Sequence, residues 1–219
     1  MQPQGKKQQP SGRYPAPEPT LRRLPWYLAY VSMLEAHDVT HISSTAIAKE
    51  INVDAAQIAK DLSVLDIKGK TRIGYDVKEL ERALKDFLGF DREHRAVIVG
   101  VGSLGSALMA DKGLERYGLN IMAGFDIDTS IVGNTIKGKP IFHIDSLKEK
   151  IDHYNAGIGI VTVPVEYAQQ VADQLVEAGV SAIWNYTPFR IRTASDVVIQ
   201  NTSIYAHLAV MYNRILSEK

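Results

Sequence analysis

The stretch that decides the fold is Ala96-Val97-Ile98-Val99-Gly100-Val101-Gly102-Ser103-Leu104-Gly105. An apolar run, typical of a buried strand, leads directly into glycines with the spacing G-x-G-x-x-G. Asp126 follows 21 positions after the last of these glycines, at the end of a second apolar run. A strand, a glycine turn, a helix and a later acid form the context that this motif requires to bind a dinucleotide. The sequence therefore predicts a nucleotide-binding unit that begins near residue 96.

Each position of the motif has a physical role. Gly100 permits the tight turn, Gly102 lets a pyrophosphate approach bare backbone, and Gly105 lets helix and strand pack closely. The free N–H groups and the positive dipole end of the next helix, which begins at Ser103, then meet the phosphates. Asp126 can accept hydrogen bonds from both ribose hydroxyls and would repel a 2′-phosphate, while Asp128 adds a second negative charge. The pattern favours NAD(H) over NADP(H), and a glycine turn that serves packing alone is the alternative.

The rest of the second half alternates strands with helices. We expect strands at residues 96–99, 120–125, 158–163 and 181–185, and helices at residues 103–109 and 165–178. Such alternation predicts a parallel sheet covered on both faces. The chain ends with a helical stripe of apolar residues, namely Ile204, Leu208, Met211, Tyr212 and Ile215.

The first half has a different organisation. Residues 1–19 contain five prolines and almost nothing to bury, which predicts a flexible tail. Helical spacing predicts helices at residues 21–34, 46–51, 55–65 and 77–88, with residues 43–45 and Asp54 as caps. Residues 68–75 are punctuated by glycines and predict a basic hairpin. Two short helices followed by such a hairpin indicate a winged helix-turn-helix.

Candidate DNA-binding residues lie on the third predicted helix, on the hairpin and at one cap. Gln57, Lys60 and Ser63 are expected to face the major groove, because they lie opposite the apolar Ile58 and Leu62. Basic hairpin residues are expected to contact phosphates or the minor groove, and no acid occurs at residues 67–75. An ordinary solvated face is the alternative. The full set is Ser44, Gln57, Lys60, Ser63, Lys68, Lys70, Arg72 and Tyr75.

Composition excludes several classes of protein. The chain has no cysteine, so disulfides, thiol catalysis and Cys-ligated zinc are excluded, and no other metal-ligand spacing occurs. Its 25 basic and 25 acidic residues cancel, and neither a membrane span nor a signal peptide is visible. His143 and His153, in the connection after the second strand, and His207, on the last helix, have no evident carboxylate partner. We therefore expect a cytoplasmic protein that is not an enzyme and that binds neither membrane nor metal.

The combination of motifs resembles the Rex family of redox-sensing transcriptional repressors. The resemblance rests on the glycine motif and on Pro17-Glu18-Pro19-Thr20-Leu21-Arg22-Arg23-Leu24-Pro25, Ile42-Ser43-Ser44-Thr45, Val53-Asp54, Lys60-Asp61-Leu62-Ser63, Gly74-Tyr75, Phe125-Asp126-Ile127-Asp128, Thr162-Val163-Pro164 and Trp184-Asn185-Tyr186-Thr187-Pro188. It implies that Ile127, Thr162, Val163, Pro164, Asn185, Tyr186 and Thr187 join residues 100–105, Asp126 and Asp128 in the cofactor site.

The resemblance also implies how such a protein works. It implies a homodimer that exchanges its C-terminal helix between subunits, and in which each recognition helix and wing binds half of an inverted repeat in operator DNA. NADH, bound in preference to NAD⁺, would close the dimer and release the DNA, being sensed and not consumed. The implied organisation is a tail at residues 1–19, a winged-helix domain at 20–88, a Rossmann-like domain at 89–202 and a swapped helix at 203–219.

The chain departs from the family pattern at several positions. Ala59 stands where many relatives have an arginine, and the wing tip reads Lys70-Thr71-Arg72 where relatives often place an arginine followed by glycine. The three residues of an interdomain switch in relatives correspond here to Ala29, Asp111 and Ser203, and all three differ. The Asp111 carboxylate could attract the positive nicotinamide of NAD⁺ and narrow the preference for NADH.

Two other functions stay open at this point. A small NAD-dependent oxidoreductase would use the same glycine motif, and a module that binds CoA or another nucleotide would use the same fold. Neither needs the basic cluster in the first third of the chain. Asp126 disfavours CoA, because the 3′-phosphate on the CoA ribose would be repelled by an acid at that position.

Overall fold

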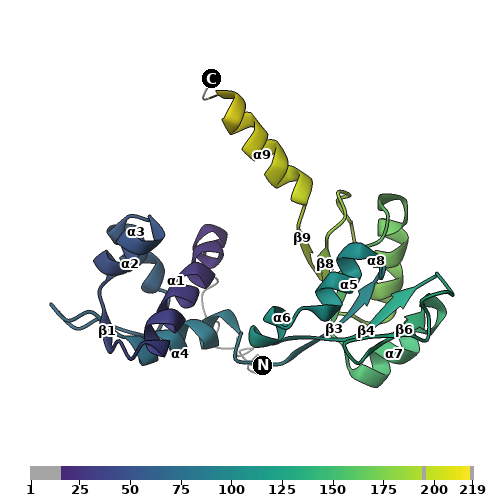
Figure 1. Cartoon of the computed structure of the whole chain (residues 1–219), viewed down its shortest axis with the longest axis horizontal. Coiled ribbons are helices and arrows are strands. Elements are labelled where there is room, and N and C mark those ends of the chain that lie inside the picture. The colour runs from purple at the N-terminus through teal and green to yellow at the C-terminus, as the bar shows by residue number, and fades with distance from the viewer. Residues whose placement is uncertain (1–15, 194–195, 218–219) are drawn as a thin grey trace, which may run out of the picture. The chain divides into compact units, whose positions relative to one another are not determined.

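The computed structural model describes residues 16–193 and 196–217, which form two compact units that divide between Asp91 and Arg92 (Figure 1). The predicted tail falls mainly on residues 1–15, which lie outside the described residues. Glu18 and Pro19, assigned to the tail from sequence, instead form the first turn of a helix, where a proline needs no backbone donor.

The N-terminal unit is a helical domain with a small sheet. Its elements are α1 (Glu18–Ala36), β1 (His41–Ile42), α2 (Ser44–Ile51), α3 (Ala55–Leu62), β2 (Tyr75–Asp76) and α4 (Val77–Leu88). The core is formed where these helices meet, and its largest fully buried side chains include Leu24, Tyr27, Leu28, Ile47, Ile58, Leu62, Leu80 and Leu84. This packing places α2 and α3 as the two helices of a helix-turn-helix.

Side-chain caps set where these helices begin. The Ser43 hydroxyl accepts a hydrogen bond from the Ala46 backbone N–H at 3.1 Å and starts α2. Asp54 does the same for α3, with the N–H of Ala56 at 2.8 Å. Gly89, with φ of 72°, ends α4 in the left-handed conformation that glycine adopts without steric cost. The start of α3 and the end of α4 are those that the sequence predicted, whereas α2 begins two residues before its predicted start at residue 46.

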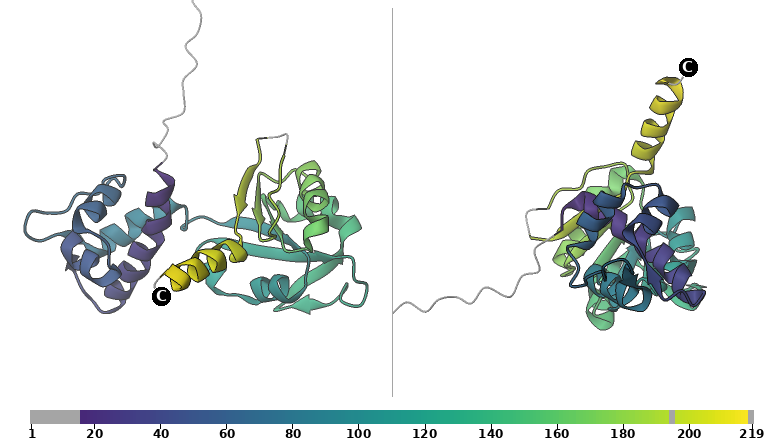
Figure 2. Two further views of the ribbon diagram at one scale, coloured as in Figure 1. Left: turned by 90° about the horizontal axis from the view of Figure 1, so that it is seen from above. Right: turned by 90° about the vertical axis from the view of Figure 1, so that its left-hand side faces the viewer.

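Two local predictions for this unit were wrong. Helix α3 ends at Leu62, three residues early, and Leu65 is buried from a turn instead of from the helix. Residues 68–75 do not form a regular hairpin, because β2 pairs antiparallel with β1. The loop between α3 and β2 is closed only by a bridge between Lys70 and Gly74 and projects from the helices (Figure 2). The wing is thus a basic loop on a short sheet.

The C-terminal unit is built on a seven-stranded sheet. Its strands are β3 (His94–Val99), β4 (Leu119–Asp126), β5 (Thr135–Ile136), β6 (Lys139–His143), β7 (Ile158–Val161), β8 (Ala182–Asn185) and β9 (Val198–Asn201). The order is β5-β6-β4-β3-β7-β8-β9, with every neighbouring pair parallel except β5 with β6. Without β5 this is the 3-2-1-4-5-6 order of a dinucleotide-binding fold, whose switch point lies between the first and fourth strands, here β3 and β7.

Helices cover both faces of the sheet. They are α5 (Ser103–Ala110), α6 (Gly113–Arg116), α7 (Leu147–Tyr154) and α8 (Ala168–Glu177), with short 3₁₀ turns η1 (Ile144–Ser146) and η2 (Val165–Tyr167). Strand β3 serves both cores, since Val97 and Val99 pack with α7 and α8, whereas Ala96 and Ile98 pack with Met109 of α5. The fully apolar run at residues 96–99 is therefore explained by burial on both sides.

The last helix, α9 (Ile204–Ser217), has no buried residue, and all of its residues except the half-buried Leu208 are exposed. It follows β9, and Thr202 between them accepts a 2.9 Å hydrogen bond from the Trp184 indole N–H. Its apolar stripe is exposed, with Met211 at 47%, Tyr212 at 56% and Ile215 at 52%. None of the described helices has both the length and the apolar character needed to span a bilayer.

Candidate dinucleotide site and nucleic-acid interface

The glycine loop lies at the carboxyl end of β3, at the switch point of the sheet. Gly100 has a φ of 93°, and a Cβ there would lie 2.9 Å from the Thr162 carbonyl. A Cβ on Gly105 would collide with the Gly100 carbonyl oxygen, so the first turn of α5 rests directly on the loop. The Thr162 hydroxyl donates to that same oxygen at 2.7 Å and ties the loop to the end of β7.

The N-terminus of α5 is open. Gly102 is the N-cap and offers no side chain to the free N–H groups, and nothing lies within 4 Å of the place where its Cβ would be. Ser103 begins the helix behind it. Backbone donors that face open space at the positive end of a helix dipole form a site for phosphate oxygens.

Asp126 ends β4 beside this loop. Its carboxylate accepts hydrogen bonds from three backbone N–H groups: Val101 at 2.7 Å, Ile127 at 2.8 Å and Asp128 at 3.1 Å. These bonds lock the carboxylate at the edge of the site. Oδ1 accepts two of them and Oδ2 only one, so Oδ2 still has lone-pair capacity for a ligand hydroxyl.

Two cavities meet at the end of β7. The larger, of about 640 Å³, is lined by Gly100, Gly102, Asp126, Ile127 and, from the α8 side, Tyr167, Gln170 and Gln174. The other, of about 390 Å³, is lined by Leu104, Tyr186, Thr187 and the start of α9. Thr162, Val163 and Pro164 line both. One extended ligand could therefore place one half on each side of these residues, with its middle over the glycine loop.

Some predicted cofactor residues do not line these cavities. Asn185 is fully buried, and its amide bonds only protein groups, including the Phe189 carbonyl at 2.6 Å and the Asn201 side chain at 2.9 Å. It shapes the loop that carries Tyr186 and Thr187, and we no longer expect it to touch a cofactor. Asp128 instead accepts the Ser130 backbone N–H at 2.9 Å.

The sequence interpretation of His143 was wrong. His143 is the last residue of β6 and pairs in register with Asp126 of β4, so it does lie at the carboxyl end of a strand. Its Nδ1 lies 3.0 Å from a carboxylate oxygen of Asp145. The prediction failed because β6 was not recognised as a strand: Lys139 and Pro140 interrupt its apolar character.

Asp111 has a local role in the structure. Its two carboxylate oxygens accept the backbone N–H groups of Gly113 at 3.0 Å and Leu114 at 3.1 Å, at the start of α6. It lines neither of the two cavities at the glycine loop. These bonds favour a role for the Asp111 carboxylate in capping the start of α6. They do not favour the suggested attraction between this carboxylate and the nicotinamide of NAD⁺.

Sequence reasoning missed the wall of the larger cavity formed by Tyr167, Gln170 and Gln174. The helical pattern at residues 165–178 was visible, but which face of that helix overhangs the glycine loop depends on the packing of α8 on the sheet. No motif marks these residues. Within the described residues, no three His, Asp or Glu side chains gather as a metal site would require.

In the N-terminal unit, the solvent-facing side of α3 carries small side chains and one lysine. Lys60 and Ser63 are exposed as predicted, together with Ala56 and Ala59. Gln57 is only half-exposed, because its side chain turns toward Asp61 one helical turn further on. Ser44 is half-exposed at the start of α2.

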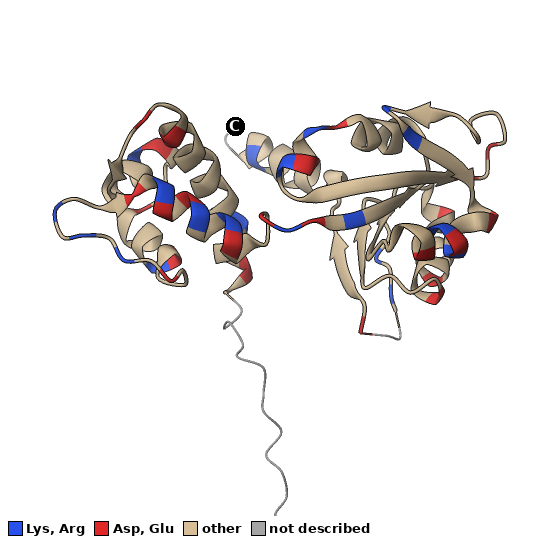
Figure 3. Ribbon diagram, turned by 90° about the horizontal axis from the view of Figure 1, so that it is seen from below, with Lys and Arg blue, Asp and Glu red and all other residues tan. Residues whose placement is uncertain are grey.

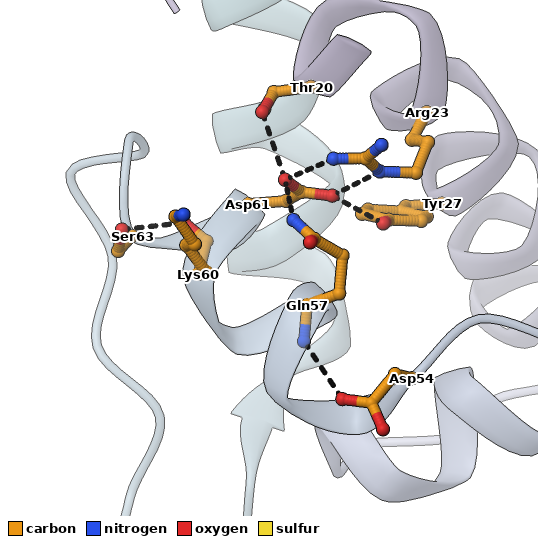
Figure 4. Close-up of polar contacts among 8 residues, drawn as sticks. All are labelled: Thr20, Arg23, Tyr27, Asp54, Gln57, Lys60, Asp61 and Ser63. Atoms are coloured by element: carbon orange, nitrogen blue, oxygen red, sulfur yellow. Dashed lines mark hydrogen bonds and ion pairs between the residues drawn. The ribbon is translucent and has the colours of Figure 1, made fainter. Parts of the chain in front are cut away.

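Asp61 is the centre of a buried polar cluster that joins α3 to α1 (Figure 4). It accepts hydrogen bonds from the Tyr27 hydroxyl at 2.7 Å, the Thr20 hydroxyl at 2.9 Å and the Gln57 amide at 2.9 Å. Arg23 grips both oxygens, at 2.6 and 2.8 Å. Burial alone would raise the pKa of Asp61, but these four donors lower it to about 2.

The loop between α3 and β2 carries exposed cations. Lys68, Lys70 and Arg72 are all exposed on it (Figure 3), and Tyr75 lies half-exposed beneath with its ring against Gly69. An exposed recognition helix beside a basic loop is the arrangement by which winged helices contact DNA.

Comparisons with known proteins find relatives for both units of the chain. Residues 16–63 match a family described as "Putative DNA-binding protein N-terminus", and residues 91–189 match the "CoA binding domain" family. A redox-sensing transcriptional repressor Rex from Bacteroides fragilis is 56% identical over 91% of this chain and 90% of its own length. The Porphyromonas gingivalis Rex is 52% identical over 92% of both chains. The chain belongs to the Rex family.

Solved structures of a Rex-family repressor support this assignment. The repressor RSP in complex with β-NAD⁺ and operator DNA superposes with a TM-score of 0.89, at 32% identity and 94% coverage of both chains. Its complex with β-NADH gives a TM-score of 0.82. Rex proteins are transcriptional repressors, which confirms the sequence prediction that the chain is not an enzyme.

Proposed function

We propose that this Rex protein binds operator DNA through α3 and the wing, binds NAD(H) across the glycine loop, and is released from DNA by NADH. The observation that carries the proposal is the open N-terminus of α5, with Asp126 beside it, in the same chain as an exposed recognition helix. The RSP complexes with β-NAD⁺ and operator DNA and with β-NADH support it.

Within this proposal, each half of the dinucleotide occupies one of the two cavities. The adenosine half lies against Ile127 with its ribose on Asp126, and the nicotinamide lies against Leu104, Tyr186 and Thr187. Burial raises the pKa of Tyr186 to about 12. Its hydroxyl is protonated at neutral pH, as an ordinary tyrosine is, and can donate a hydrogen bond. Asp126 disfavours CoA and NADP(H), whose ribose phosphates it would repel.

The proposed organisation is a homodimer in the cytoplasm, where NADH and DNA are both present. Exchange of α9 between subunits would cover its exposed stripe, and two recognition helices would then read an inverted repeat. The proposed winged helix spans residues 18–91, the dinucleotide domain residues 92–202 and the dimerisation helix residues 203–219, so the proposed tail ends before α1.

Operator binding measured with and without each cofactor tests the proposal. We expect NADH to weaken operator affinity more than NAD⁺ does, by a factor typical of allosteric coupling, about 5- to 150-fold. Because linkage is reciprocal, operator DNA should lower the affinity for NADH, relative to the affinity for NAD⁺, by the same factor. Equal operator affinity in NADH and NAD⁺ would contradict the proposal.

Gly102→Asp provides a matched control for this experiment. The fold has room for the side chain, since nothing lies within 4 Å of the Cβ position. The new carboxylate would occupy the proposed place of the pyrophosphate and repel it. The variant should keep its operator affinity and lose its response to NADH.

A further inference from the structure

The side chain of Gln57 is held in one orientation. Its Nε2 donates to Oδ1 of Asp61 at 2.9 Å, one turn along α3. A flipped amide would place the Gln57 carbonyl oxygen against the Asp61 carboxylate oxygen, and two acceptors repel each other. The amide nitrogen therefore points inward.

The acceptor that sets this orientation cannot move away. The side chain of Asp61 is 0% exposed, and α1 holds it through Thr20, Arg23 and Tyr27. These three lie on one face of α1, so the carboxylate is fixed relative to two helices at once (Figure 4).

The carbonyl oxygen of Gln57 points the other way. Among the described residues it accepts no hydrogen bond, and no buried side-chain oxygen or nitrogen there lacks a partner. The oxygen is therefore in contact with solvent. It lies in the first turn of α3, and recognition helices contact base edges with their N-terminal residues.

We propose that Asp61 is a positioning residue for base recognition: it holds the Gln57 amide with its carbonyl oxygen outward, so that Gln57 selects a base with an exocyclic amino group. The inference rests on the proposed operator binding. In the major groove, adenine N6 and cytosine N4 are the donors that such an acceptor can meet, whereas guanine and thymine present acceptors on their edges. At one operator base pair, the strand whose base is contacted should thus carry A or C, so that A·T or C·G is accepted there and the flipped pairs T·A and G·C are not.

The test is selection of DNA duplexes from a library with a randomised centre, followed by sequencing and by affinity measurements on single-base variants of the preferred duplex. Wild type should show one position restricted to A or C. Gln57→Met, which keeps length but has no amide, should lose roughly fivefold to tenfold discrimination at that position alone. Lys60→Met is the matched control on the same helix face and should leave that position unchanged.

Asp61→Asn gives a second readout. An amide at residue 61 can donate to Gln57, which frees the Gln57 amide to flip, so guanine or thymine should become acceptable at the same position. Thermal unfolding of each variant shows whether it folds, and Gln57→Met decides the matter where Asp61→Asn does not fold.

The outcomes separate the two proposals. If wild type selects no sequence, operator binding itself is wrong and the inference falls with it. If wild type selects an operator but Gln57→Met has the same preference at every base pair, only the inference is overturned. A uniform loss over all base pairs, or an affected base pair at which A·T and T·A, or C·G and G·C, are accepted equally well by wild type, would overturn it as well.

Discussion

At the scale of single residues, the Asp126 carboxylate has a role in the fold besides its proposed contact with a ribose. Its three backbone hydrogen bonds hold the glycine loop against β4, while its place on the cavity wall lets it face a ribose. Sequence spacing predicted the second role but not the first, because the contact with Val101 depends on the loop geometry. A substitution at Asp126 will therefore disturb the loop for every cofactor and the ribose contact for some.

The ratio of two cofactor affinities isolates the ribose contact. Asp126→Ala should weaken NADH relative to NADPH by about tenfold or more, because a charged acceptor and its repulsion of the 2′-phosphate are both lost. A disturbed glycine loop weakens the binding of both cofactors, so its effect cancels in the ratio of the NADH and NADPH affinities. Titration of both cofactors by fluorescence measures it, with Asp128→Ala as a control that should give a smaller change. If the ratio of the two affinities is unchanged in Asp126→Ala, Asp126 does not contact the ribose.

Asp61 makes a prediction about stability and pH. Its pKa falls from 3.8 in the unfolded chain to about 2 in the fold, so ionised Asp61 contributes about 2 kcal/mol to the free energy of unfolding. A lowered pKa means that this contribution is complete above pH 4 and is lost as the pH falls from about 4 to about 2. Asp61→Asn should therefore be strongly destabilised at pH 7 and less so, relative to wild type, at pH 3.

Denaturant unfolding followed by Trp26 fluorescence in a Trp184→Phe background reports on the N-terminal unit. The difference in unfolding free energy between wild type and Asp61→Asn is the quantity of interest. A difference that stays constant from pH 5 to pH 2.5 would show that the carboxylate is not stabilised by its four donors.

At the scale of elements, the sequence predicted those with a strong period or a strong cap. The helix capped by Asp54 begins where expected, the helix capped by Ser43 begins two residues early, and the fully apolar run at residues 96–99 is a buried strand. Strand β6 was missed because a lysine and a proline break its pattern, and β9 because its residues are mostly exposed at a sheet edge. The pairing of β2 with β1 was invisible, since about thirty residues separate two strands of two residues each.

The basic loop between α3 and β2 should make operator binding depend on salt concentration. Lys70→Ala should reduce the slope of log operator affinity against log salt by about one unit, because one phosphate contact is lost. The loss of affinity should be similar for all DNA sequences, since a phosphate contact carries no base information. Lys85→Ala is the control: that lysine pairs with Glu81 on α4, and its loss should leave the slope unchanged. A change in base preference with an unchanged salt slope would mean that Lys70 reads bases.

At the scale of the whole molecule, two units with separate cores could be predicted from the spacing of apolar residues. This spacing is helical throughout the first half, whereas the second half alternates apolar strands with helices. What the sequence could not show is which residues of α8 overhang the glycine loop, or that Gln57 turns inward toward Asp61. Both depend on contacts between elements far apart in the chain. For α9, the resemblance to the Rex family implied that a second subunit covers its apolar stripe. Within one chain, no residue of this helix is buried.

A helix of 14 residues is marginal in water without tertiary packing, so α9 must be covered to be stable. We therefore expect a chain truncated after Thr202 to be monomeric in sedimentation experiments, whereas the full chain is a dimer. This end point keeps β9 and the bond from Trp184 to Thr202, so the dinucleotide domain should still fold. Within the full chain, Leu208→Glu places a charge on the apolar stripe and should dissociate the dimer. Asn213→Glu places the same charge on the side of the helix opposite Ile204 and should not. A truncated chain that stays dimeric would show that another surface holds the subunits together, and the exchange of α9 would then be wrong.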